Sequence, residues 1–423
     1  MCPVMHITIF AAGSRGDIQP CVVLGRGLQR AGFDVLLAAP ENFAGFVGEH
    51  GLNFRPLRGD VQQIMASETG RGFMEKGSAN PLQSIRAMRT MLGPVATQMA
   101  EDALEACQGA GALVSLAVFA TLAKTIAEVR QIPLIHVEPT PVFPTRAFPA
   151  PGWPLQRDLG GLHNRFSGHA MLQVLWQWYR PFVNNFRHRF GLPPYTGASF
   201  YKILSSTPLL GAYSDQVIPR PPDWPENIHI TGYWFPDPPT EWKPGDDLQD
   251  FLDSGDPPVY VGFGSMSGRQ PEKLAALVLE ALAQSGQRGL LLTGWGGMRA
   301  LSVPDHVFVL DSAPHGWLFP RMAAVVHHGG AGTTAEGLRA GVPTLILPFA
   351  VDQAFWGKRV KALGVGPEPI PFRKLTAARL ARAIREAVTQ PEIRRSAAGL
   401  GAAIRAQDGL GNAVSVIKEC LGA

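Results

Sequence analysis

The two halves of the chain open with the same order of sequence features, and this repeat constrains the fold more than any other property. Residues 5–32 read as a buried apolar strand, a loop of glycine and serine, and a helix with apolar positions at helical spacing. Residues 257–286 repeat that order around the loop GFGSMSG. Runs of β-branched and leucine residues followed by helices are typical of parallel strands in βαβ units. The sequence therefore predicts an α/β fold of two Rossmann-like domains, each built on a parallel sheet.

The boundary between the halves is marked by composition. Residues 219–258 contain ten prolines and show no helical periodicity, as expected of a linker. We predict an N-terminal domain over residues 1–235, a Pro-rich linker over 236–256 and a C-terminal domain over 257–407. Residues 408–423 are predicted to form a helix that packs back on the N-terminal domain. Ligands of such sheets bind outside the carboxyl ends of the strands, so we expect the two parallel sheets to face a central cleft.

Composition excludes few functions but bears on the kind of partner and on the cellular compartment. Of the 423 residues, 46% are apolar and 17% charged, and the net charge of +4 is spread without a basic run, which argues against nucleic acid as the partner. The four cysteines are far apart and form no metal-binding or CxxC motif, as in a reducing compartment. The start of the chain lacks the pattern of a signal peptide, and the longest apolar stretch, residues 111–123, is too short to cross a bilayer. We expect a cytoplasmic protein, and contact with a membrane surface is left open.

A glycine-rich turn in the second half predicts an anion site. Residues 324–337 pass from an apolar strand through two histidines and three glycines into a helix, without the G-x-G-x-x-G spacing or a P-loop lysine. The first N–H groups of a helix lack intrahelical partners, and the helix dipole places about half a positive charge there. The hydroxyls of Thr333 and Thr334 can donate to phosphate oxygens, and His328 can donate or carry a charge. We predict a diphosphate site that needs no metal, since the sequence has no Asp-x-Asp triplet; a plain tight β–α turn is the alternative.

Polar residues near this turn suggest a bound nucleoside and sugar. Glu336 lies one turn into the predicted helix, where its carboxylate could accept two hydrogen bonds from a ribose diol. Asp352 and Gln353 follow the next apolar strand, at the same carboxyl edge, and could bind sugar hydroxyls.

These motifs, together with the preceding SAPHGWLFPRMAAVV and the N-terminal GSRGDIQP, resemble the inverting nucleotide-sugar glycosyltransferases of family 1, which have the GT-B fold. The sterol and lipid glucosyltransferase branch is most similar, along with bacterial enzymes that glycosylate natural products. The similarity covers both domains and is most specific in the C-terminal one. The resemblance implies a donor site made of His328, Gly330, Gly332 and Thr333 at the diphosphate, Glu336 at the ribose, Asp352 and Gln353 at the hexose, and Ser265 near the phosphates.

One departure from the family concerns the nucleobase. Plant members stack uracil on a tryptophan where this chain has Ser312. The base must then stack on another side chain, for which Trp295 is a candidate, or a different base is used. A packing role for Trp295 is equally consistent with the sequence.

The catalytic base is predicted to be Asp17. Transfer to a hydroxyl needs a base near the acceptor oxygen, and Asp17 of GSRGDIQP corresponds to the histidine of the family's GHxxP motif, where bacterial and sterol-acting relatives have Asp. A water-poor site would have to raise the pKa of this carboxyl. The alternative role is to cap a helix that begins near Ile18, and both roles are compatible. Plant members support their base with an aspartate where this chain has Leu116, so Asp17 is expected to act alone or with another partner.

The acceptor side is rich in aromatics. Residues 138–154 and 171–182 combine prolines with aromatic side chains and suggest a large apolar acceptor, although half of the aromatics in 171–182 are better explained as helix core. Residues 60–100, rich in Met and Gly with little periodicity, are expected to form a mobile acceptor loop. The acceptor-binding candidates are Phe143, Phe148 and Trp153.

The sequence thus predicts a GT-B enzyme that moves a hexose, glucose from UDP-glucose, to a hydroxyl of a hydrophobic acceptor such as a sterol, lipid or natural-product aglycone. The UDP-sugar is a co-substrate, and neither a cofactor nor a metal is expected. The alternatives are an antibiotic-tailoring enzyme that uses a TDP-deoxysugar and, from another class, a non-catalytic nucleotide-sugar binding protein. The oligomeric state is left open.

Overall fold

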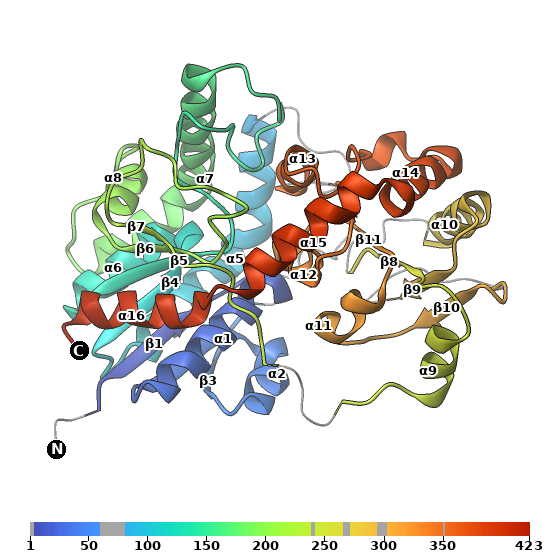
Figure 1. Cartoon of the computed structure of the whole chain (residues 1–423). Helices are drawn as coiled ribbons and strands as arrows, with labels where there is room; N and C mark the ends of the chain where they lie inside the picture. The colour runs from blue at the N-terminus through green and yellow to red at the C-terminus, as the bar shows by residue number, and fades with distance from the viewer. Residues whose placement is uncertain (1–3, 60–80, 238–241, 265–270, 294–302, 350–351) are drawn as a thin grey trace. The chain divides into compact units, whose positions relative to one another are not determined.

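The computed structural model describes residues 4–59, 81–237, 242–264, 271–293, 303–349 and 352–423 (Figure 1). The chain forms two compact units. Residues Met1–Pro236 and Asp408–Ala423 make the first unit, and Asp237–Gln407 make the second. Each unit is built on one parallel sheet, so the two α/β units with parallel sheets that the sequence predicts are confirmed.

The sheet of the first unit has the strand order β3-β2-β1-β4-β5-β6-β7, in which the order turns back at β1. All its neighbouring strands are parallel. The strands are β1 (His6–Phe10), β2 (Asp34–Pro40), β3 (Asn53–Leu57), β4 (Ala112–Leu116), β5 (Leu134–Glu138), β6 (Leu209–Gly211) and β7 (Ile228–Ile230). The helices are α1 (Arg15–Arg30), α2 (Ala44–Glu49), α5 (Pro81–Ala106), α6 (Ala120–Arg130), α7 (Gly161–Arg189), α8 (Ser199–Ser206) and α16 (Gly409–Leu421).

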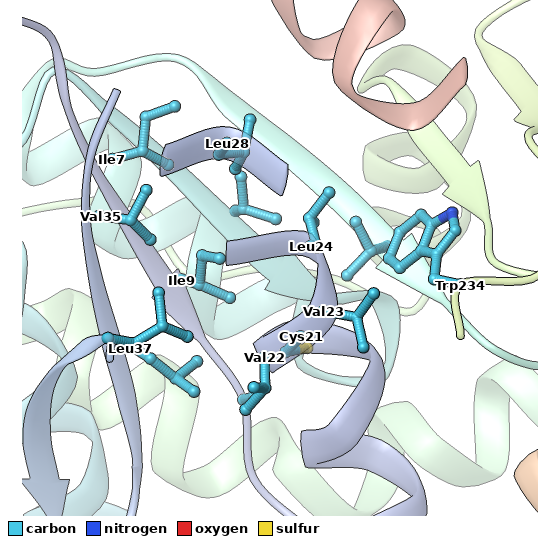
Figure 2. Close-up of a cluster of buried hydrophobic side chains, with 14 of the residues drawn as sticks. Ile7, Ile9, Cys21, Val22, Val23, Leu24, Leu28, Val35, Leu37 and Trp234 are labelled. Carbon is cyan, nitrogen blue, oxygen red and sulfur yellow. The ribbon is translucent and has the colours of Figure 1, made fainter. Parts of the chain in front are cut away.

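Alternation along the strands builds a core on each face of this sheet. Ile7 and Ile9 of β1 point to the face covered by α1, where they meet Leu24 and Leu28 (Figure 2). Phe10 and Leu113 point to the opposite face, which α5, α6 and α7 cover with alanines and larger apolar residues. Both faces of a parallel sheet are buried in this way, and its carboxyl edge is left for ligands.

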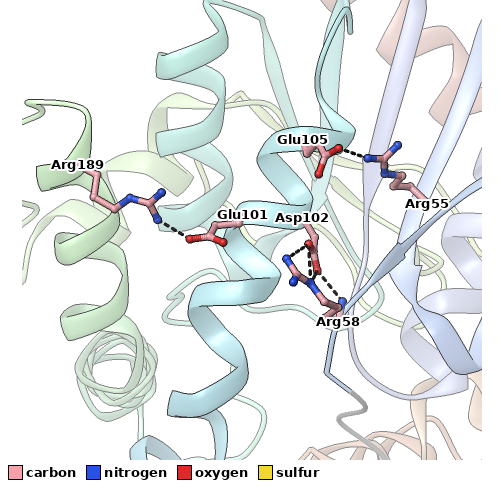
Figure 3. Close-up of polar contacts among 6 residues, drawn as sticks. All are labelled: Arg55, Arg58, Glu101, Asp102, Glu105 and Arg189. Atoms are coloured by element: carbon pink, nitrogen blue, oxygen red, sulfur yellow. Dashed lines mark hydrogen bonds and ion pairs between the residues drawn. The ribbon is translucent and has the colours of Figure 1, made fainter.

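The long helix α5 is fixed to its neighbours by ion pairs (Figure 3). The guanidinium of Arg58 donates to both carboxylate oxygens of Asp102, at 2.7 to 3.1 Å, and the Arg58 backbone N–H donates to the same carboxylate at 2.8 Å. Burial of Asp102 opposes its ionisation, but the bonds from Arg58 outweigh burial and lower the pKa of that carboxyl. Residues 81–100 belong to this helix, so the prediction of an acceptor loop over residues 60–100 is wrong for that part. Residues 60–80 lie outside the described residues.

The second unit has a sheet of order β10-β9-β8-β11-β12, again parallel throughout. Its strands are β8 (Val259–Gly262), β9 (Gly289–Leu292), β10 (Val307–Leu310), β11 (Ala324–His327) and β12 (Thr344–Ile346). Its helices are α9 (Asp246–Asp253), α10 (Pro271–Ser285), α11 (His315–Leu318), α12 (Ala331–Ala340), α13 (Gln353–Ala362), α14 (Ala377–Thr389) and α15 (Pro391–Arg405). One face packs on α10 and α14, and the other on α9 and α11.

The segment predicted as a linker, 236–256, is only partly irregular. It contains the helix α9, which starts with Asp246 and Asp247 in its first turn, where they complement the helix dipole. Its Leu248 is buried against Tyr260 of β8 and Leu318. A short helix with one buried leucine shows too little periodicity to be recognised among prolines.

The last helix, α16, belongs to the first unit although the chain reaches it from the second. It packs on α1 at Gly27, where a Cβ atom would lie 2.8 Å from Cδ1 of Leu410 and 3.2 Å from Cγ2 of Val414. Ala413 and Ile417 are fully buried in the core beneath α1. The glycine thus allows the close approach of the two helices.

Candidate active site

The turn between β11 and α12 is shaped by glycines that no other residue could replace without movement. Gly329 has φ of +95°, and a Cβ atom there would lie 2.6 Å from Cγ2 of Ile346. Its N–H donates to Nδ1 of the fully buried His327 at 3.0 Å. Gly330 is the N-cap of α12, so the N–H groups that follow it have no acceptor within the helix. The turn presents a row of backbone donors, which is the arrangement that binds anions.

The imidazole of His328 lies over this turn. A Cβ atom at Gly330 would be 2.7 Å from Nε2 of His328, so a side chain at Gly330 would push the ring away. Burial lowers the pKa of His328 to about 4. In the ligand-free protein the ring is therefore neutral near pH 7 and can donate one hydrogen bond.

The two threonines in the first turn of α12 differ in their exposure to solvent. The hydroxyl of Thr334 is buried and donates to the carbonyl of Gly330 at 2.9 Å, so the expected donation to a ligand is not its role here. Thr333 is partly exposed and Gly332 is exposed, with nothing within 4 Å of a Cβ at Gly332. A ligand atom can therefore approach the helix start at Gly332 and Thr333.

Further along α12, Glu336 lines a cavity of about 330 Å³. The other residues that line it are Gly316, Pro320, Arg339, Ala340 and Arg405. The Oε2 atom of Glu336 is buried and accepts no hydrogen bond from the described residues, and it lies 3.7 Å from Nη1 of Arg339. Burial raises the pKa of Glu336 to about 7, against the opposing effect of Arg339. A buried carboxylate oxygen that lacks a donor is a site for a hydroxyl-bearing ligand.

The next connection places Asp352 and Gln353 beside the same turn. Oε1 of the buried Gln353 accepts from the N–H of Phe349 at 2.8 Å, and the Gln353 carbonyl would be 3.2 Å from a Cβ at Gly329. Asp352 is the N-cap residue of α13 and accepts from the indole N–H of Trp356 at 3.0 Å. His328, Glu336, Asp352 and Gln353 thus all lie at the carboxyl edge of β11 and β12. Ser312 is exposed after β10, whereas Ser265 and Trp295 lie outside the described residues.

In the first unit, Asp17 is the third residue of α1 and not its cap. The cap is Ser14, whose N–H and hydroxyl donate to Oδ2 of Asp17 at 2.7 and 2.9 Å, as in a capping box. Burial raises the pKa of Asp17, and the two bonds from Ser14 partly offset it. The carboxylate therefore has both a fixed position and a raised pKa.

A second carboxylate at the carboxyl edge of the first sheet, that of Glu138, was not predicted from the sequence. Glu138 is the last residue of β5 and is only 6% exposed. Burial together with the charges of Glu138 and Asp17 raises the pKa of Tyr179, which shows that both carboxylates lie near that phenol. Leu116 ends the intervening strand β4 in the apolar core. An acidic residue directly after a buried apolar strand was the signal that could have identified Glu138.

Comparison with known proteins decides the family. The family model of the glycosyltransferase family 28 N-terminal domain matches residues 7–149, and that of the erythromycin biosynthesis protein CIII-like C-terminal domain matches residues 296–416. The O-mycaminosyltylonolide 6-deoxyallosyltransferase of Streptomyces fradiae is 38% identical over 98% of this chain and 97% of its own length. The chain belongs to the family 1 GT-B glycosyltransferases.

Two further similarities complete the comparison. A sterol 3-beta-glucosyltransferase of Arabidopsis thaliana is 37% identical over 97% of this chain, which spans 65% of that protein's length. The crystal structure of the glycosyltransferase of kitacinnamycin superposes with a TM-score of 0.74 at 20% identity, covering 99% of both chains. The structural similarity shows that this glycosyltransferase has the GT-B fold, as predicted.

The aromatic residues predicted to bind an acceptor lie at different depths in this glycosyltransferase. Phe143 is 4% exposed and packs on Tyr201 and Trp224 with ring centroids 5.2 and 6.5 Å apart, so it offers almost no surface to a ligand. Phe148 and Trp153 are partly exposed, and Trp153 meets Phe166 edge to face at 6.0 Å. Of these three candidates, Phe148 and Trp153 can therefore contact an acceptor without a rearrangement of the core, and Phe143 cannot.

Within the described ranges, no three His, Cys, Asp or Glu side chains are arranged to hold a metal ion. No helix among the described residues of this glycosyltransferase is both long and apolar enough to cross a membrane.

Proposed function

We propose that the protein transfers a hexose, glucose from UDP-glucose, to a hydroxyl of a hydrophobic acceptor such as a sterol, a lipid or a natural-product aglycone. The observation that carries this proposal is the combination of the β11–α12 turn, with its unpaired N–H groups, and the cavity at Glu336. The similarity to a sterol 3-beta-glucosyltransferase supports a sterol-like acceptor.

The second unit would hold the donor. The N–H groups that begin α12 and the neutral His328 would donate to the diphosphate, and no metal would be needed. The buried oxygen of Glu336 would accept from the ribose diol. Asp352 and Gln353 would bind hydroxyls of the sugar. Hydrogen bonds that strengthen as the leaving diphosphate gains charge lower the barrier to transfer.

On the first unit, Asp17 would act as the general base. The acceptor oxygen attacks the anomeric carbon, the bond from that carbon to the phosphate oxygen breaks, the acceptor proton goes to the Asp17 carboxylate, and UDP leaves. A single displacement of this kind converts an α-linked donor to a β-glycoside. The raised pKa of Asp17 makes it a stronger base than an exposed aspartate.

The test is mass spectrometry of reactions that contain UDP-glucose and a panel of sterols, polyphenols and macrolides. A mass gain of one hexose on an apolar alcohol is expected, and Asp17→Asn should lower the rate by at least about a hundredfold. The exposed Asp305→Asn is the matched control and should leave the rate unchanged. Product formation by Asp17→Asn at the parent rate would reject the base assignment.

A second candidate is transfer of a deoxysugar from a TDP donor. Its support is the deoxyallosyltransferase relative, which matches along nearly its whole length. TDP-deoxysugars and macrolide acceptors in the same assay distinguish it, since only this candidate predicts a product with them and none with UDP-glucose. Tight binding of UDP with no product from any donor would instead favour a non-catalytic binding protein.

A further inference from the structure

An exposed apolar surface lies on the first unit, over the loop before α7 and the first turns of that helix. Within residues 155–166, Leu155 is 47% exposed, Leu159 54%, Leu162 79% and Phe166 62%. These four are the majority of the seven large apolar side chains that are exposed in the described part of the chain. Single exposed apolar residues are ordinary, but a cluster of them marks an interaction surface. We call these four side chains the 155–166 patch.

The backbone under the patch is held by polar side chains that point inward. The side-chain amide of Asn164, 1% exposed, donates to the carbonyl of Arg146 at 3.0 Å and to Asp158 at 2.8 Å. The amide of Gln156 donates to the carbonyls of Ala150 and Trp153 at 2.7 and 2.8 Å. The polar side chains thus fix the loop while the leucines face outward. The four apolar side chains are therefore exposed on a segment whose backbone is held in place.

Three exposed arginines lie in or beside the patch. Arg146, Arg157 and Arg165 are exposed, and Arg146 lies beside the start of α7, with its Cβ 3.0 Å from where a Cβ of Gly161 would be. Among the described residues, the carboxylates of Asp158 and Asp223 accept hydrogen bonds from this segment. Asp158 accepts from the N–H of Gly160 at 2.8 Å and from Asn164.

The second carboxylate, Asp223, accepts from the hydroxyl of Thr145 at 2.6 Å and from the N–H of Arg146 at 2.9 Å. Between residues 140 and 170, Asp158 is the only acidic residue, against three arginines. The donors to Asp158 and Asp223 are uncharged, so both carboxylates keep their negative charge. The three arginines outnumber them, and the rim of the patch has an excess of one positive charge.

We propose that the 155–166 patch docks on a lipid bilayer with anionic headgroups. The leucines and Phe166 enter the boundary between headgroups and acyl chains, and the arginines contact the phosphates. Apolar side chains with a basic rim are the combination that binds anionic bilayer surfaces. The proposal does not depend on glycosyl transfer.

The test is co-sedimentation of the full chain with vesicles of phosphatidylcholine alone and of phosphatidylcholine with 30% phosphatidylglycerol. We expect binding to the anionic vesicles that weakens in 0.5 M NaCl. The variant Leu162→Ser/Phe166→Ser should bind at least about tenfold more weakly. The control Val4→Ser/Val303→Ser, exposed apolar residues outside the patch, should bind like the parent. Unchanged thermal unfolding of both variants shows that they are folded.

Loss of two of the charges, in Arg157→Gln/Arg165→Gln, should weaken binding to the anionic vesicles selectively. Absence of binding to either vesicle, or binding that Leu162→Ser/Phe166→Ser leaves unchanged, overturns the proposal. So does sedimentation equilibrium that shows a dimer which Leu162→Ser/Phe166→Ser dissociates, because the patch would then be a contact between copies.

Discussion

At the scale of single residues, the pKa of Asp17 links its place in the fold to its proposed chemistry. Burial raises this pKa and the bonds from Ser14 lower it. A base must be ionised, so the turnover rate at saturating donor is expected to fall as the pH drops through the pKa of Asp17. Ser14→Ala removes the hydroxyl bond, which raises the pKa further, and should move this acidic limb to higher pH.

The same Ser14→Ala change removes the N-cap of α1 and should cost about 1 kcal/mol of unfolding free energy. Ser205→Ala, at a partly exposed position of α8 where the hydroxyl donates only to the carbonyl of Lys202, is the control for loss of a serine hydroxyl. The pH profile of kcat is the measurement. A limb that stays in place in Ser14→Ala would mean that Asp17 is not the group that titrates.

Glu336 gives a second pH dependence, in donor affinity instead of turnover. Its pKa of about 7 lies above the value of an exposed glutamate, so the group is increasingly protonated below pH 7. An ionised carboxylate accepts two hydroxyls, and the affinity for UDP is therefore expected to fall as the pH drops from 8 to 6. Titration calorimetry with UDP across this range is the measurement.

Glu336→Gln should weaken UDP binding by roughly 10- to 100-fold and flatten the pH dependence, whereas the exposed Glu392→Gln should leave both unchanged. The pH dependence of the stability of the unliganded protein gives an independent check of the direction of this pKa shift. A carboxyl whose pKa is raised by folding favours the folded state below pH 4.5, and this contribution is lost as the pH rises through 7. Glu336→Gln lacks the carboxyl group, so its free energy of unfolding should no longer show this decrease between pH 4.5 and 7.

At the scale of elements, the β11–α12 turn offers a matched pair of glycine variants. Gly329→Ala puts a Cβ into a positive-φ position and 2.6 Å from Ile346, which should cost about 1–3 kcal/mol of stability. Gly332→Ala meets nothing within 4 Å and should fold normally. It should nevertheless weaken UDP binding, since the methyl group would occupy the helix start where the phosphate is proposed to lie. Normal binding of UDP by Gly332→Ala would place the phosphate elsewhere.

Elements with strong periodicity were predictable from sequence, and the site elements followed from them. The strand, glycine turn and helix around residues 324–337 could be placed because an apolar run, a cluster of glycines and a helix start follow one another directly in the sequence. The helix over 81–106 was not recognised, because its sequence shows little periodicity and contains Gly93. It is held by packing of Ala100 and Ala103 on the sheet and by ion pairs such as Arg58–Asp102, which join residues far apart in the sequence. Glu138 was missed because only the strand order β1-β4-β5 brings the end of its strand near the strand that precedes Asp17.

At the scale of the whole molecule, the chain closes its first unit with its last helix. Residues 408–423 are predicted from the sequence to pack back on the N-terminal domain, and in the structure α16 belongs to the first unit. The contact has a physical basis in Gly27, which admits Leu410, and in the burial of Ala413 and Ile417. Folding of the first unit therefore needs residues from both ends of the sequence, with the whole second unit inserted between them.

This arrangement predicts that a change in the last helix destabilises the unit that contains the first strand. Ile417 is fully buried, so Ile417→Ala should cost about 2–5 kcal/mol of the unfolding free energy of the first unit. In calorimetry, the transition of the second unit can be recognised because UDP is expected to raise it. Ile417→Ala should lower the other transition and leave the UDP-sensitive one in place, while Glu419→Ala, at an exposed position of α16, should change neither. A shift confined to the UDP-sensitive transition would show that α16 stabilises the second unit instead.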